Sequence, residues 1–279
     1  MKQFAFIIII LTTILSCNNT KKVSADAQNS KKVLPYDWSK PKLLKEKMLT
    51  ALKAKQETED KIILDYLNEY AKLEDEINEI LQSQPNIDNL NTLAYSDKSK
   101  VSKDALELEK EVKRNGFKIS SSEGMIYVAK NSEFIKSQTI DLLDSTSVEF
   151  INLYCDELDL PCCDDAAIMI SGEILVKRAY QWGELSKKVE GLRYEQIVKD
   201  EYKEYLQLLF IGLDNTPSFD WTTNQFNTKL LKQLQNIIKN YPNSKAAKEF
   251  IQFIDLLKNA NYAKNESVES YLKSKFELQ

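Results

Sequence analysis

Residues 42–82 read KLLKEKMLTALKAKQETEDKIILDYLNEYAKLEDEINEILQ and contain neither glycine nor proline. Apolar side chains recur there at alternating steps of three and four residues, at Ile63, Tyr66, Tyr70, Leu73, Ile77 and Ile80. This spacing places them along one side of an α-helix over about three heptads. Residues 41–83 are therefore expected to be helical, either as one long helix or as a helical hairpin.

The heptad register is interrupted at Gln56 and Glu59, which are polar where the pattern requires apolar residues. One interpretation is a long helix with a polar break, and the other is a hairpin that turns near residues 57–60. The apolar seam then either dimerises two chains as a coiled coil or joins two antiparallel helices within one chain. We favour the antiparallel pair because the seam is short.

The rest of the chain continues as helix-length amphipathic segments between isolated glycines and prolines. Only 6 glycines and 6 prolines occur in 279 residues, too few for a sandwich or barrel with frequent turns. One β signal stands out at residues 117–128, where two alternating apolar runs flank Glu123 and Gly124. The expected fold is mainly α, a multi-helix bundle or an irregular helical array, with one small β-hairpin near 117–128. Residues 84–279 would form one helical domain.

The N-terminus has the pattern of an export signal. Lys2 precedes an apolar stretch of twelve residues, 4–15, which is too short to cross a bilayer. The sequence Ile-Leu-Ser-Cys then ends at Cys17 and is followed by a polar run. This pattern resembles the lipobox of bacterial lipoproteins. The resemblance implies that residues 1–16 are a signal peptide and that Cys17 carries fatty acids such as palmitate, which anchor the protein to a membrane.

Residues 17–40 are polar and lysine-rich and lack apolar periodicity, so they are expected to be a flexible tether. Tyr36 and Trp38 are placed to dock the end of this tether onto the first helix. The chain as a whole resembles exported bacterial lipoproteins. That resemblance implies attachment to the envelope, at the outer membrane in preference to the inner one, with the body in the periplasm or on the surface.

A second resemblance lies at residues 236–247, where Tyr241 and Pro242 are followed by Ser244. The segment is similar to the helix–turn–helix junction of tetratricopeptide-like proteins, because proline stops one helix and serine caps the next. This implies stacked helix pairs. No regular repeat is present along the chain, so a regular repeat architecture is not expected.

Composition excludes several common kinds of site. The chain has no histidine, which removes Ser-His-Asp triads, Cys-His pairs and histidine-ligated metals. It has no Gly-x-Gly and no Gly-Lys sequence, so a dinucleotide fingerprint and a phosphate-binding loop are absent. With 38 basic and 42 acidic residues, the net charge is −4, which gives no basic face for nucleic acid. We expect neither a cofactor nor a nucleic-acid partner.

The densest group of reactive side chains is CDELDLPCCDD, residues 155–165. Cys155 is expected late in one helix, where it would form a disulfide with Cys162 or Cys163 in the loop that follows. A metal is the alternative, with thiolates for zinc or carboxylates for calcium. The segment has no CxxC pair and no calcium-loop spacing. A disulfide is therefore expected here, and no metal site.

Residues 212–221, GLDNTPSFDW, form the one loop with the character of a binding site. Gly212 ends one predicted helix and Pro217 delays the next, so the backbone between them is expected to be irregular and at the surface. The loop combines large rings with hydrogen-bond acceptors, in Asp214, Asn215, Phe219, Asp220 and Trp221. Exposed aromatic side chains are typical contact anchors. The alternative is that both rings are buried and that the loop is a structural corner.

Two kinds of function are compatible with these observations. The first is a lipid-anchored envelope scaffold or binding protein without catalytic activity, whose partner is an envelope protein or a glycan. The second is an envelope hydrolase that cleaves glycans with a pair of carboxylates. The 42 acidic residues offer many pairs, and no spacing selects one. We favour the binding protein and assign no catalytic residue.

Overall fold

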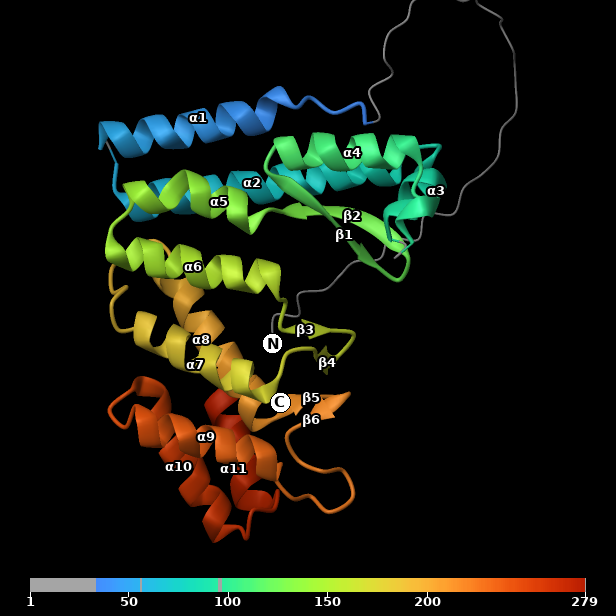
Figure 1. Cartoon of the computed structure of the whole chain (residues 1–279). Coiled ribbons are helices and arrows are strands. Elements are labelled where there is room, and N and C mark those ends of the chain that lie inside the picture. The colour runs from blue at the N-terminus through green and yellow to red at the C-terminus, as the bar shows by residue number, and fades with distance from the viewer. Residues whose placement is uncertain (1–33, 56, 95–96, 279) are drawn as a thin grey trace, which may run out of the picture.

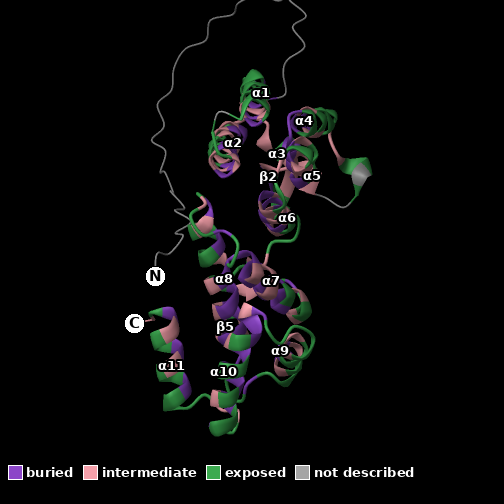
Figure 2. Cartoon of the chain, turned by 90° about the vertical axis from the view of Figure 1, so that its left-hand side faces the viewer, coloured by how far each residue is buried: buried purple, intermediate pink, exposed green. Residues whose placement is uncertain are grey.

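The computed structural model describes residues 34–55, 57–94 and 97–278. Helices make up 65% of the structure, and the described residues form 11 α-helices and three two-stranded antiparallel hairpins. This confirms the expected mainly α fold. The helices lie one beneath another in an elongated array, from the α1–α2 pair at one end to α9, α10 and α11 at the other (Figure 1). Buried residues line the inward faces of the helices (Figure 2).

The segment of residues 41–83 forms most of two helices, α1 (Ser39–Ala54) and α2 (Glu59–Gln82). They run antiparallel and are joined by a turn in which Lys55 adopts a left-handed backbone conformation, with φ of 51°. Tyr66, Tyr70 and Ile77 of the apolar seam are buried within this one chain. The polar residues between the two helices therefore mark a turn and not a break in one helix.

The first described residues, 34–38, are packed onto the body. Leu34, Tyr36 and Trp38 are buried, and the rings of Tyr36 and Trp38 meet edge to face with centroids 4.9 Å apart. The described end of the expected tether is thus part of the core. The remainder of that tether, together with the predicted signal peptide and Cys17, lies outside the described residues.

A β-hairpin packs beside α2, as predicted from the apolar alternation at 117–128. Its strands are β1 (Phe117–Ser122) and β2 (Met125–Lys130), with Ile119 opposite Val128. The side-chain amide of Asn78 in α2 covers the free edge of β2: its Oδ1 accepts from the Val128 N–H at 2.7 Å, and its Nδ2 donates to the Val128 carbonyl at 2.8 Å. The helix thus satisfies backbone groups that an exposed edge strand would leave unpaired.

The remaining elements continue the array. Between α2 and β1 lie α3 (Ile87–Leu90), η1 (Asn91–Ala94), η2 (Lys98–Lys100) and α4 (Lys103–Arg114). After β2 come α5 (Ser132–Thr139), η3 (Ile140–Leu142), α6 (Ser145–Asp159), α7 (Gly172–Leu185), α8 (Glu195–Phe210), α9 (Thr228–Asn240), α10 (Lys245–Asn259) and α11 (Glu266–Phe276). Serine hydroxyls cap α4, α7 and α10 by accepting a hydrogen bond from the backbone of the first turn, at Ser102, Ser171 and Ser244.

Two short hairpins that the sequence analysis did not anticipate interrupt the helical array. The first pairs β3 (Cys163–Asp164) with β4 (Ala167–Ile168), between α6 and α7. The second pairs β5 (Gly212–Leu213) with β6 (Thr216–Pro217), between α8 and α9. Both lie on the same side of the molecule as the β1–β2 hairpin (Figure 1). The segment expected to be an irregular loop is therefore partly a hairpin.

Candidate functional site

The binding loop proposed from sequence begins with the β5–β6 hairpin. Gly212 has a φ of +81°, and a Cβ atom added there would lie 2.4 Å from the Thr216 carbonyl oxygen. Only glycine fits such a close approach between the two strands. The sharp turn that follows places Asp214 and Asn215 at its exposed tip.

Asn215 joins this hairpin to the β3–β4 hairpin. Its backbone N–H donates to the Ala166 carbonyl at 3.0 Å, and its side-chain Nδ2 donates to the Asp165 carbonyl at 2.8 Å. A third bond runs from the Ile168 N–H to the Thr216 hydroxyl at 2.7 Å. Asn215, which the sequence analysis named as a contact residue, thus serves to fasten two hairpins together.

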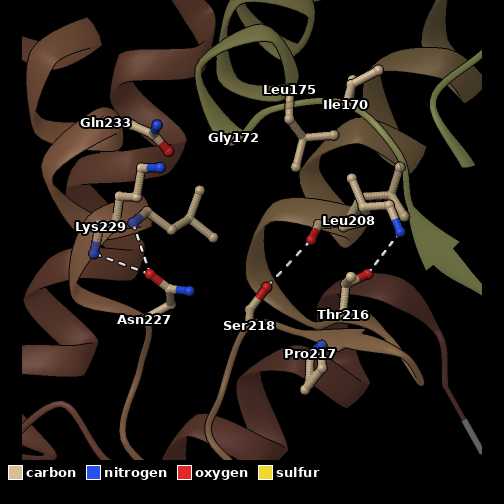
Figure 3. A pocket seen from close by; sticks show the side chains of 12 residues that line it. Ile170, Gly172, Leu175, Leu208, Thr216, Pro217, Ser218, Asn227, Lys229 and Gln233 are labelled. Atoms are coloured by element: carbon tan, nitrogen blue, oxygen red, sulfur yellow. Dashed lines mark hydrogen bonds between the residues drawn. The ribbon is translucent and has the colours of Figure 1, made fainter.

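A cavity of about 290 Å³ opens beside the joined hairpins. Thr216, Pro217 and Ser218 form part of one wall, and residues from α9 face them across the opening (Figure 3). The complete lining is Ile168, Ile170, Gly172, Leu175, Leu208, Thr216, Pro217, Ser218, Asn227, Lys229, Leu230 and Gln233. Most of these side chains are apolar, none is a carboxylate, and Lys229 supplies the one charge. The lining therefore suits an apolar ligand group, and it lacks the carboxylates that a carboxylate-dependent hydrolase requires.

The two rings of the loop have different environments. Phe219 is 5% exposed and packs edge to face against Phe226, with ring centroids 5.1 Å apart. Trp221 is 73% exposed, the largest exposed fraction of any large apolar side chain in the described part of the chain. The expectation of an exposed aromatic anchor therefore holds for Trp221, whereas Phe219 belongs to the core.

Trp221 stands on an ordered turn that Asp220 organises. The Asp220 Oδ1 atom accepts from the backbone N–H groups of Thr222 and Thr223, at 3.0 and 2.7 Å, and from the Thr223 hydroxyl at 2.9 Å. The hydrogen bonds from Thr223 are the main cause of the lowered pKa of Asp220. Bridges from Phe219 to Phe226 and from Gln225 to Ala263 close the turn at its base. The backbone that carries the indole is thus ordered before any partner arrives.

The cysteines do not form the expected disulfide. Cys155, Cys162 and Cys163 are all free thiols. Cys155 is buried in α6, with its Sγ 3.7 Å from the Ser132 carbonyl oxygen, and burial raises the pKa of its thiol to about 12. Cys162 and Cys163 are half-buried, and their Sγ atoms lie 3.1 Å apart. The contact between thiols is therefore made by the two adjacent cysteines.

A buried polar network, which the sequence analysis missed, joins α6, α7 and α8. The Glu157 Oε2 atom accepts from Arg178 and from the Tyr205 hydroxyl, each at 2.7 Å, and its Oε1 accepts from the Trp182 indole at 3.2 Å. Arg178 also donates to the Asp156 carbonyl at 2.7 Å. Arginine is rare in this chain, and that rarity is the hint of the network that the sequence offers. The sequence alone does not show which carboxylate the arginine contacts.

Two further carboxylates, Glu201 and Glu204, lie beside this network. Burial raises the pKa of Glu201 to about 7, and the neighbouring carboxylates of Glu204 and Glu157 contribute. Both oxygens of Glu157 already accept hydrogen bonds, which assigns that carboxylate to the network. Among the residues that the structure covers, no group of three or more carboxylates and thiols is placed to hold a metal ion.

No family model, curated protein or solved structure matches this chain. Within the described ranges, no helix is both long enough and apolar enough to cross a bilayer.

Proposed function

We propose that this protein is a lipid-anchored binding protein or scaffold of the bacterial envelope, held to the membrane through Cys17. Its helical body presents a contact surface at the exposed turn that carries Asp220 and Trp221, within the predicted binding loop. The observation that carries the binding role is the 73% exposure of Trp221 on a turn fixed by Asp220. The anchor rests on the lipobox-like sequence that ends at Cys17.

An exposed indole on a rigid turn favours binding for two physical reasons. The ring buries a large apolar area when a partner covers it, which contributes about 2 kcal/mol or more at a contact centre. The turn is already ordered, so binding does not have to supply the free energy of ordering it. The three hydrogen bonds to Asp220 Oδ1 provide this order.

The surroundings of the ring favour a polar partner. Trp221 is flanked by the carboxylate of Asp220 and the hydroxyl of Thr222, both exposed to solvent. An aromatic face beside hydrogen-bonding groups suits the apolar face of a sugar, or a protein surface that carries lysine. Both are available to a protein anchored in the envelope.

The contact is tested by placing a photo-crosslinking amino acid at position 221 of the full chain in cells. Position 251 is the matched control, because Ile251 is a 40% exposed apolar residue on α10. We expect adducts from position 221 that are absent from position 251. Crosslinked products of one discrete size identify a protein partner, whereas products that form a ladder of sizes identify a glycan. Equal amounts of adduct from positions 221 and 251 would contradict the proposed binding role.

The anchor is tested separately with Cys17→Ser in the same cells. We expect the variant to leave the membrane fraction while its body stays folded, because the acyl chains supply the membrane affinity. A variant that remains in the membrane fraction after a high-salt wash would contradict the anchor, whatever the crosslinking result.

A further inference from the structure

The two adjacent cysteines at the start of β3 form a reactive unit that the proposed binding role does not use. Their Sγ atoms lie 3.1 Å apart, and both residues are only half-buried, so each is partly exposed to solvent. Cys155, by contrast, is completely buried in α6. The described part of the chain thus contains one inert thiol and one accessible pair of thiols.

We propose that Cys162 and Cys163 are a redox-active dithiol, which closes to a reversible disulfide by exchange with an external disulfide. The inference does not depend on the Trp221 contact. It rests on the separation of the two sulfur atoms, on their accessibility and on the polar groups that surround them.

Thiol–disulfide exchange requires an attacking thiolate and a resolving thiol, and the surroundings give these roles to different cysteines. The hydrogen bond between the two sulfur atoms is the largest cause of a lowered pKa at Cys163, and it outweighs burial and the nearby carboxylates of Glu204 and Glu157, which raise that pKa. The same hydrogen bond, together with burial, raises the pKa of Cys162. Cys163 is therefore the attacking thiolate and Cys162 the resolving thiol, since exchange proceeds through the thiolate form.

The reaction takes place in two steps. The Cys163 thiolate attacks one sulfur of an external disulfide, RS–SR, so that a Cys163–SR bond forms and RS⁻ leaves and takes up a proton. Cys162 loses its proton to water and attacks the Cys163 Sγ, which expels the second RS⁻. Two protein thiols are oxidised to one disulfide, and RS–SR is reduced to two RSH.

The bond is expected to be easily reduced. Adjacent Cα atoms are about 3.8 Å apart across a trans peptide, below the range of about 4.4–6.8 Å that unstrained disulfides occupy. No cis peptide bond occurs among the described residues. Closing the ring also disturbs β3, because the Cys162 carbonyl accepts from the Met169 N–H at 2.8 Å and Cys163 pairs with Ile168. Strain of this kind makes a disulfide labile and suits a reversible switch.

The test equilibrates the folded full chain with oxidised and reduced glutathione, blocks free thiols by alkylation, and maps the peptides by mass. In the wild type, the peptide with Cys162 and Cys163 should become lighter by two hydrogens and escape alkylation, and reduced glutathione should reverse this. Cys155 should remain a free thiol, alkylated only after unfolding. Cys162→Ser should retain one glutathione on Cys163, because the resolving thiol is missing.

Cys163→Ser is the matched variant, and it should take up glutathione at least about fivefold more slowly, because burial still raises the pKa of the remaining Cys162 thiol. Three outcomes would overturn the proposal: full alkylation of both cysteines under oxidising conditions, a stable glutathione adduct on the wild type, or a disulfide that includes Cys155. The wild-type map decides the question even if a variant folds poorly.

Discussion

The guanidinium of Arg178 lies 2.7 Å from the carboxylate of Glu157, and the two side chains are only 6% and 22% exposed. The pair connects α7 to α6, and the Tyr205 hydroxyl connects it to α8. A buried ion pair is costly to break from one side, because the remaining charge keeps its desolvation penalty without its partner. This contact therefore fixes how three central helices pack.

Replacing Arg178 by methionine should lower the free energy of unfolding by about 2–4 kcal/mol, because Glu157 loses its charged partner. Urea denaturation measures the change. The control is Lys188→Met, whose exposed pair with Glu149 should contribute no more than about 1 kcal/mol. Equal effects from the two variants would show that the buried network does not hold the helices together.

Gly116→Ala should destabilise the fold by about 2–4 kcal/mol, through both backbone strain and crowding. Its φ is +92°, and an added Cβ would lie 2.6 Å from the Phe134 ring and 2.8 Å from the Tyr70 hydroxyl. Gly124→Ala is the matched control, with φ of +80° but no atom within 4 Å, and should cost about 1 kcal/mol. Similar melting temperatures for the two variants would refute the steric part of the argument.

Glu201→Gln should raise stability at pH 8 by about 1–3 kcal/mol and leave it unchanged at pH 4. Burial raises the pKa of Glu201 from 4.5 to about 7 in the folded chain, so the folded state binds more protons than the unfolded state between these values. Stability due to this group therefore falls as the pH rises from 4.5 to 7. The effect is measured by thermal melts, as the difference in stability between the variant and the wild type at each pH. The control is the exposed residue Glu79, changed to glutamine and measured in the same way.

Trp221→Phe should remove most of the tryptophan fluorescence that acrylamide quenches. The other two tryptophans, Trp38 and Trp182, are 7% and 1% exposed. The variant should unfold within about 0.5 kcal/mol of the wild type, because an exposed ring contributes little to packing. Unchanged quenching would mean that the ring is covered in solution, either by the chain itself or by a second copy.

Local signals in the sequence identified much of the helical structure. The sequence predicts Ser244 as a cap from its position after Tyr241 and Pro242, and its hydroxyl accepts the capping hydrogen bond. The β1–β2 hairpin was visible from apolar alternation around Glu123 and Gly124. These features depend on neighbours within a few residues, so one sequence is enough to show them.

The features that depend on distant residues could not be predicted. The β3–β4 and β5–β6 hairpins have two-residue strands, which are too short to show alternation, and hydrogen bonds from Asn215 and Ile168 join them. Phe219 and Trp221 carry the same local signal, but Phe219 meets Phe226 while the turn at Asp220 redirects the chain before Trp221. The disulfide expectation failed for Cys155 because α6 buries that thiol beside Ser132.

The burial of Leu34 has a mechanical consequence. Leu34 is the first described residue, and it is completely buried in the core. Tyr36 lies close enough to Glu76 of α2 for that carboxylate to help raise its pKa, and Lys40 forms an ion pair with Glu76. These contacts fasten the start of the described body to α1 and α2 together, so a force applied at this end of the body would be resisted by two helices and not by one.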